Sequence, residues 1–140
     1  MTSRHQDAIL AIDWRTRRLV WSWEPGVLSG PHAASPLANG NILVFDNGLT
    51  RGWSRVLEID PLNPTRAKQF AFKAAKVFSR VMGDCQRLSN GNTLFVHSEG
   101  GAVAELTATG RPVWRYEASQ STPTGHRANI ARLQRLPPTQ

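Results

Sequence analysis

A segment built around an Asn-Gly pair occurs twice in the chain, at residues 36–45 and again 51 positions later at residues 87–96. Apolar residues flank the pair in both copies. Asn-Gly between apolar runs is the strongest short-range signal of a β-hairpin, because both central residues of a type I′ turn need positive φ. Each copy therefore predicts two antiparallel strands joined at the Asn-Gly pair.

Two further segments follow each hairpin, and both recur along the chain. The third-strand segments occupy residues 54–60 and 101–107, with an earlier copy at residues 7–13. Their last apolar residues are spaced 47 positions apart, at Ile12, Ile59 and Leu106. Each is followed by a fourth segment that contains aromatic residues, at residues 19–23, 69–72 and 112–116. The repeating unit is therefore four strands in about 47 residues.

Four short strands at a period of about 40–50 residues are typical of β-propeller blades, in which each sheet buries its faces against its neighbours. We predict an all-β fold, a partial β-propeller with about two and a half four-stranded antiparallel blades. The propeller region covers residues 7–118. The predicted units are an N-terminal tail, a half blade, two whole blades and a C-terminal tail, at residues 1–6, 7–23, 32–72, 83–116 and 119–140.

The predicted number of blades raises the question of what closes the propeller. Closed propellers have about four to eight blades, so these blades alone would leave sheet faces and edges open. Either the chain is part of a longer protein, or a second copy or another chain completes the propeller. A start in the middle of a blade favours the first explanation.

The charge balance suits an anionic partner only in part. The chain has 17 Lys and Arg against 10 Asp and Glu, a net charge of +7, and 14 of the basic residues are Arg. A planar guanidinium matches sulfate and phosphate groups. The arginines are nevertheless spread along the chain, apart from residues 15–18 and 127–135, which is typical of solvated surface charge. We therefore predict no nucleic-acid partner.

Composition excludes several other classes of protein. No apolar run approaches the roughly 18 residues that cross a bilayer, and the start of the chain has no signal-peptide pattern, so we expect no membrane span and leave the location open. The single cysteine, Cys85, excludes an internal disulfide and is expected to be a buried, unreactive thiol. The histidines and acidic residues do not cluster at ligand spacing, so neither a metal nor a cofactor is predicted.

Several stretches resemble the C-terminal blades of the bacterial arylsulfotransferase family, at residues 37–48, 54–61, 77–95 and 110–119. The shared features are an Asn-Gly hairpin leading into Phe-Asp-Asn-Gly, a Glu-Ile-Asp-Pro strand and a second hairpin that contains Gln-Arg-Leu. The resemblance implies transfer of a sulfuryl group from a phenolic sulfate ester to a phenol through a sulfated histidine. Aryl sulfates and phenols would then be the small-molecule partners. Members of this family are often exported.

His32 is the candidate catalytic residue that this resemblance implies. It follows Gly30 and Pro31, just before the first hairpin, where members of the family commonly carry a histidine. A neutral imidazole nitrogen can attack sulfur and later leave, which divides one transfer into two steps. The competing interpretation is an exposed loop histidine.

Pairing about the two Asn-Gly turns predicts that His32 faces Asn47 and that Asp84 faces His97. The first strand of each blade lies nearest the channel of a propeller, so these residues are expected on one rim. Arg55 starts a third strand on the same rim, further out. We predict Asn47, Arg55 and His97 as substrate-binding residues. The competing roles are a turn for Asn47, a solvated strand end for Arg55 and an ordinary Asp-His hydrogen bond for His97.

Two other functions stay open. The first is a non-catalytic propeller-type interaction module, in which open sheet edges and an Arg-rich surface pair with another protein or a second copy. The second is a propeller dehydrogenase with a quinone cofactor. The sequence gives that function little support, because it has no vicinal cysteines and no cluster of acidic residues that would suit calcium.

Overall fold

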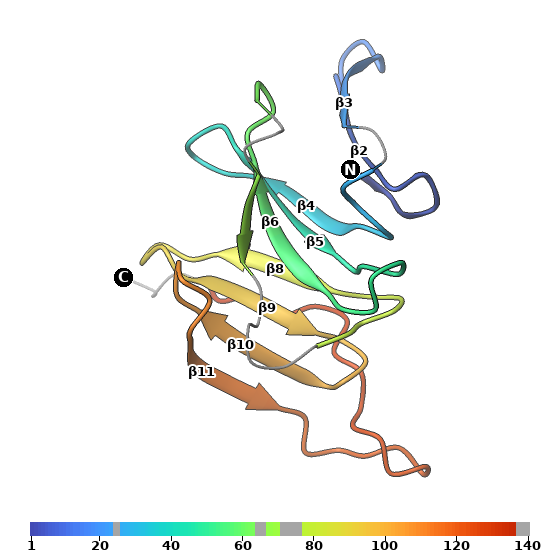
Figure 1. The fold of residues 1–140 in the computed structure, drawn as a ribbon, viewed down its shortest axis with the longest axis vertical. Coiled ribbons are helices and arrows are strands. Elements are labelled where there is room, and N and C mark those ends of the chain that lie inside the picture. The colour runs from blue at the N-terminus through green and yellow to red at the C-terminus, as the bar shows by residue number, and fades with distance from the viewer. Residues whose placement is uncertain (24–25, 64–66, 71–76, 137–140) are drawn as a thin grey trace.

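The computed structural model describes residues 1–23, 26–63, 67–70 and 77–136. In these residues the strands form three antiparallel sheets of three, four and four strands, and each strand pairs with the next one along the chain (Figure 1). The one helical element is a short 3₁₀ turn at Arg4–Gln6. The predicted all-β, partial propeller is therefore confirmed. No helix in the described ranges is long and apolar enough to cross a membrane.

The three sheets follow one another as blades. The first sheet contains β1 (Thr2–Ser3), β2 (Ala8–Ile12) and β3 (Leu19–Trp23). The second contains β4 (His32–Pro36), β5 (Ile42–Asp46), β6 (Arg55–Ile59) and β7 (Lys68–Phe70). The third contains β8 (Asp84–Arg87), β9 (Thr93–His97), β10 (Ala102–Leu106) and β11 (Pro112–Glu117). The predicted fourth strand at residues 69–72 extends beyond the described residues, which end at residue 70 here.

The first residues of the chain add a strand to the expected half blade. Thr2 pairs with Ile9 and Ser3 with Ala8, antiparallel to β2. The 3₁₀ turn then ends at Asp7, which has φ +52°. The stretch assigned to an N-terminal tail thus contributes a second-strand fragment to the first sheet.

The Asn-Gly hairpins differ from the predicted type I′ turn. Leu37 N–H donates to Asn41 O at 2.8 Å, and Gly40 N–H donates to Leu37 O at 3.0 Å. Gly40 has φ +84°, whereas Asn39 keeps a negative φ. This is a three-residue loop, with a type I turn followed by a left-handed glycine. The expectation of two central residues with positive φ was therefore wrong.

The extra loop residue shifts each hairpin by one position. Asp84 pairs with Val96, not with His97 as predicted. His32 pairs with Phe45, and the register changes between His32 and Ser35. Because side chains alternate between the two faces of a strand, a one-residue shift moves a side chain to the opposite face.

The asparagines of these hairpins are tied to the third strand of their own blade. Asn39 Nδ2 and Asn41 Nδ2 donate to Glu58 Oε1 at 3.0 and 2.8 Å. In the next blade, Asn90 and Asn92 donate to Glu105 in the same way, at 3.1 and 2.6 Å. The recurring Asn-Gly-Asn sequence therefore holds each hairpin to the third strand of its blade, which explains why it repeats with the blades.

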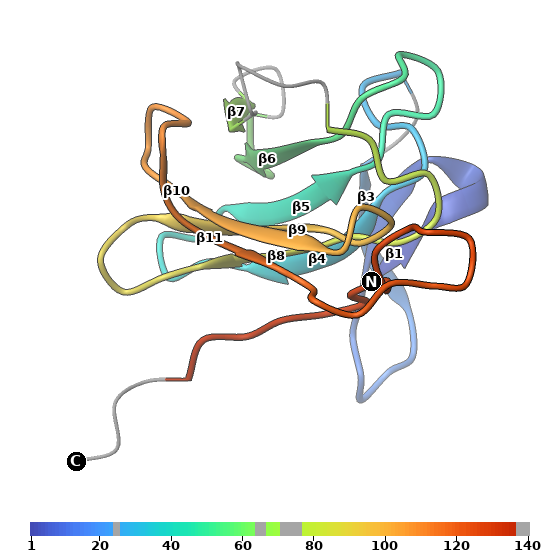
Figure 2. The same ribbon diagram turned by 90° about the horizontal axis from the view of Figure 1, so that it is seen from below.

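Apolar side chains fill the space between neighbouring sheets, and the middle strands contribute side chains to the core from both of their faces. The core between the second and third sheets contains Leu43, Phe45, Val56, Cys85, Phe95, Ala104 and Leu106. The core between the first and second sheets contains Ile9, Trp23, Leu28, Val44, Leu57 and Ile59. On the far face of the third sheet, Leu88, Leu94, Val96 and Val103 pack with Ile130 and Leu133 of the C-terminal segment. Figure 2 shows this segment returning beneath β8 and β4.

Candidate functional site

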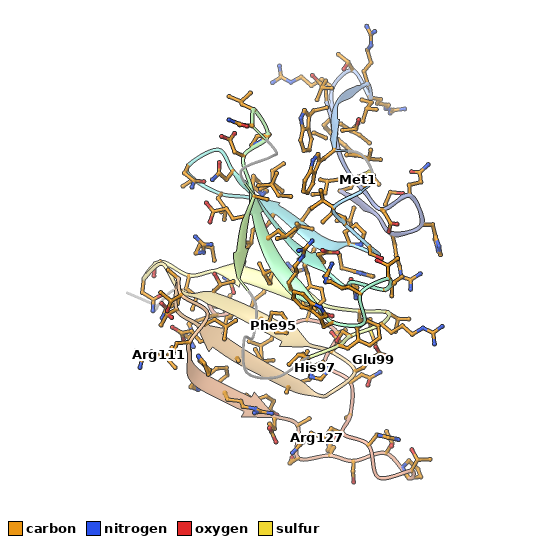
Figure 3. The ribbon with its side chains drawn as sticks, viewed as in Figure 1. Met1, Phe95, His97, Glu99, Arg111 and Arg127 are labelled. Atoms are coloured by element: carbon orange, nitrogen blue, oxygen red, sulfur yellow. The ribbon has the colours of Figure 1, made fainter. Side chains whose placement is uncertain are left out.

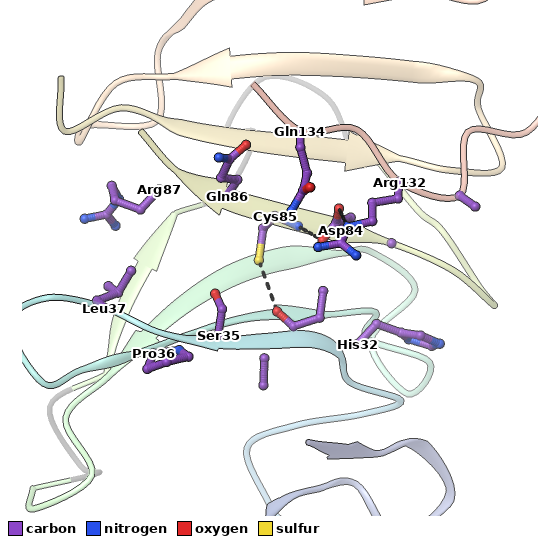
Figure 4. A pocket seen from close by; sticks show the side chains of 14 residues that line it. His32, Ser35, Pro36, Leu37, Asp84, Cys85, Gln86, Arg87, Arg132 and Gln134 are labelled. Atoms are coloured by element: carbon purple, nitrogen blue, oxygen red, sulfur yellow. Dashed lines mark hydrogen bonds and ion pairs between the residues drawn. The ribbon is translucent and has the colours of Figure 1, made fainter. Parts of the chain in front are cut away.

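The innermost strands of two blades and the C-terminal segment surround a cavity of about 460 Å³ (Figure 4). The cavity is lined by β4 with the residue that follows it (32–37), by β8 with the residue before it (83–87), and by Ala131, Arg132 and Gln134. First strands face the central channel in a propeller, so this cavity is the part of the channel that the chain encloses.

His32 lies at the rim of this cavity, where β4 begins. Its Nδ1 lies 3.0 Å from Gly30 O and 2.7 Å from Asn47 Oδ1. Ala33, the next residue, has φ +53°, and this local distortion accompanies the register change in β4. The expected neighbour of His32, Asn47, is therefore in contact with it, although the hairpin register differs from the predicted one.

Asn47 selects the tautomer of the His32 imidazole. Its Nδ2 donates to two carbonyl oxygens, Ser79 O at 2.7 Å and Met82 O at 2.8 Å, which leaves Oδ1 facing His32. Both partners of His32 Nδ1 are then acceptors, so Nδ1 carries a proton, and in the neutral ring the lone pair is on Nε2. Asn47 is fully buried and lies behind His32 rather than on the cavity wall.

A buried carboxylate holds the loop that leads to His32. Asp46 Oδ1 accepts from Ser29 N–H at 2.8 Å, and Oδ2 accepts from Arg51 Nη1 and Arg55 Nε, both at 2.9 Å. Arg55 Nη2 also donates to Val27 O at 2.7 Å. The structure thus places Arg55 in a network beneath the loop, outside the residues that line the cavity.

His97 lies apart from His32. Its Nε2 donates to Phe78 O at 3.0 Å, and it borders a smaller cavity of about 60 Å³ with Val77, Phe95 and Arg115. Burial lowers the pKa of His97, against the effect of the bond to Phe78. Figure 3 shows it at the end of β9, beside the loop that carries Glu99. The one-residue register shift separates it from Asp84, so the predicted pairing of these two residues was wrong.

Two polar residues of the cavity wall were not among the predicted site residues. Asp84 is almost buried, and burial raises its pKa, opposed by the backbone N–H of Cys85 and by Arg132. Arg132 Nε lies 3.5 Å from Asp84 Oδ2. A signal for Arg132 exists in the sequence, because residues 133–136 (Leu-Gln-Arg-Leu) repeat residues 85–88 (Cys-Gln-Arg-Leu) 48 positions later.

Cys85 also lines this cavity, but its chemistry is that of a packed side chain. Its Sγ lies 3.9 Å from Ala33 O, and burial, together with the charge of Asp84, raises its pKa far above the ordinary range. Among the described residues, no group of three or more His, Cys, Asp and Glu side chains could hold a metal ion.

Comparison with known families matches this arrangement to one of them. The family model described as Arylsulfotransferase (ASST) matches residues 3–119, which include the strands β2 to β11 in full and the last residue of β1. The chain belongs to the arylsulfotransferase family. No curated protein matches the chain.

Solved structures share the fold of this arylsulfotransferase-family chain at low sequence identity. A protein of unknown function from Bacteroides caccae has a TM-score of 0.59 and 18% identity, over 86% of this chain and 44% of that one. Virginiamycin B lyase from Staphylococcus aureus, as a catalytically inactive variant with quinupristin, has a TM-score of 0.56 and 15% identity, over 88% of this chain and 38% of that one. The chain thus spans less than half the length of these structures.

Proposed function

We propose that the chain supplies the sulfuryl-accepting histidine of an aryl-sulfate-dependent sulfotransferase, and that His32 is this histidine. The observation that carries the proposal is the fixed tautomer, in which two carbonyl oxygens hold the Nδ1 proton of His32 and leave the lone pair on Nε2. Membership of the arylsulfotransferase family supports the reaction class. The cavity beside His32 gives an aryl sulfate room to approach.

In the first step, the Nε2 lone pair attacks sulfur, the S–O bond to the aryl group breaks, and the phenolate leaves with the bonding electrons. His32 then carries the sulfuryl group on Nε2 and the proton on Nδ1, and the positive charge of its ring is stabilised by Asn47 Oδ1 and Gly30 O. In the second step, the oxygen of an acceptor phenol attacks sulfur, the N–S bond breaks and the lone pair returns to Nε2. The phenol proton passes to water.

The other predicted site residues take different places in this proposal. Asn47 orients His32 through the contact at 2.7 Å and is a positioning residue. Arg55 holds the loop before His32 through Asp46. His97 borders a different cavity, which makes it a matched control for His32.

The test is to incubate the chain with p-nitrophenyl sulfate, quench with base and measure the intact mass and the peptide masses. We expect the mass of one sulfuryl group to be added on His32, to disappear when phenol is added, and to be lost in His32→Ala but retained in His97→Ala. No adduct, or an adduct that His32→Ala retains, would overturn the proposal. That result would favour the alternative function, a non-catalytic interaction module of the propeller type.

A further inference from the structure

The C-terminal segment occupies the place of an innermost propeller strand. Arg87 of β8 donates to Glu58 Oε2 in the preceding blade at 2.8 Å, and Arg135 donates to Glu105 Oε2 at 2.6 Å. The same contact therefore recurs one blade further on, 48 residues later in the sequence. Arg135 N–H also donates to Gln86 Oε1 at 2.8 Å, and Gln86 Nε2 donates to Arg135 O at 3.1 Å.

This equivalence brings Arg132 into the channel. Arg132 corresponds to Asp84 in the repeat, so its position is equivalent to the start of the innermost strand β8. It borders the same cavity as His32, and Figure 4 shows Arg132, Asp84 and His32 at the same end of that cavity. A cation is thus placed on the wall opposite the proposed nucleophile.

The guanidinium of Arg132 is only loosely engaged. Its one ion pair among the described residues joins Nε to Asp84 Oδ2 at 3.5 Å, longer than a hydrogen bond. Its side chain is 68% exposed, whereas that of Asp84 is 11% exposed. Arg135, in the same segment, is by contrast committed to Glu105. Arg132 can therefore turn its two terminal nitrogens to an anion while Nε remains near Asp84.

We infer that Arg132 binds the sulfate group of the aryl sulfate in this cavity, and that Asp84 holds its guanidinium in place and competes with the anion. The planar fork of Arg matches two oxygens of a sulfate. This inference deepens the proposed function and rests on it for the identity of the substrate. Binding of the anion itself does not depend on the transfer chemistry.

The test measures dissociation constants in the His32→Ala background, where no sulfuryl transfer can occur. The ligands are inorganic sulfate, p-nitrophenyl sulfate and, as a probe without the anion, p-nitrophenol. We expect Arg132→Ala to raise the dissociation constants of both sulfate ligands at least about tenfold and to leave that of p-nitrophenol unchanged. Arg132→Lys should recover part of the affinity. Asp84→Asn should lower the dissociation constants of both sulfate ligands, because it removes the competing carboxylate.

Arg111, in the turn between β10 and β11, is the matched control, because Arg111→Ala makes the same change in net charge away from the cavity. Thermal unfolding of each variant shows whether binding is lost at the site itself or because the C-terminal segment no longer packs against β8. Equal affinity for sulfate in Arg132→Ala and Arg111→Ala would overturn the inference, even if His32 forms the adduct. Weakened sulfate binding in Arg132→Ala would uphold it as an anion site even if no adduct forms on His32.

Discussion

Asp46 is the residue whose removal should most disturb the loop before His32. Its carboxylate is fully buried and accepts from Ser29 N–H, Arg51 and Arg55. The two arginine side chains are themselves 20% and 16% exposed. Asp46→Ala would therefore remove the central charge of the network and leave two cations of like sign close together.

The expected cost follows from that burial. Breaking a buried ion pair by removing one partner costs roughly 3–5 kcal/mol, and the partial exposure of both arginines points to the lower end, about 3 kcal/mol. The free energy of unfolding of a small domain is about 5–15 kcal/mol. For a slope of roughly 1–3 kcal/mol per M urea, the midpoint of unfolding should fall by roughly 1–3 M.

The assay is urea unfolding followed by tryptophan fluorescence, with Glu117→Ala as the control. Glu117 pairs with Arg115 and Arg127, whose side chains are 62% and 50% exposed, and exposed pairs contribute about 0–1 kcal/mol. Asp46→Ala should thus be much more destabilising than Glu117→Ala, although both remove one carboxylate with two arginine partners. Equal effects of the two substitutions would refute the reasoning from burial.

Three further predictions concern groups near the cavity or in the hydrogen bonds between the hairpin asparagines and Glu58. Asn47→Ala should slow formation of the sulfuryl adduct by about 10²- to 10⁴-fold, because His32 loses the partner that selects its tautomer; the initial rate of adduct formation measures this. Burial raises the pKa of Glu58, but hydrogen bonds from two asparagines and Arg87 outweigh burial, so its pKa in the folded chain is lowered. Its stabilising effect is therefore complete above its unfolded pKa and is lost as the pH falls through the folded value; Glu58→Gln should weaken the dependence of the unfolding midpoint on pH in this acidic range. Cys85 should react with iodoacetamide only in denaturant, because burial raises its pKa; alkylation of the native chain at neutral pH would contradict this.

The blade architecture could be predicted from the sequence because its signals are local and repeat. The Asn-Gly pairs, the alternation of apolar residues and the spacing of Ile12, Ile59 and Leu106 lie within single blades. Each signal reports a backbone preference or a face of a strand, and neither depends on distant residues. The observed sheets of β4–β7 and β8–β11 follow this pattern strand by strand.

The details of the site depended on the tertiary structure. The hairpin register follows from a three-residue loop, and in this loop Asn39 donates a hydrogen bond to Glu58. The sequence of the turn alone is compatible with either loop length. The tautomer of His32 depends on Asn47, which is oriented by carbonyl oxygens 32 and 35 residues further along the chain. Arg132 reaches the cavity only because the C-terminal segment packs against β8. A repeat in the sequence thus determines which strands form, whereas contacts between distant segments decide which side chains meet at the channel.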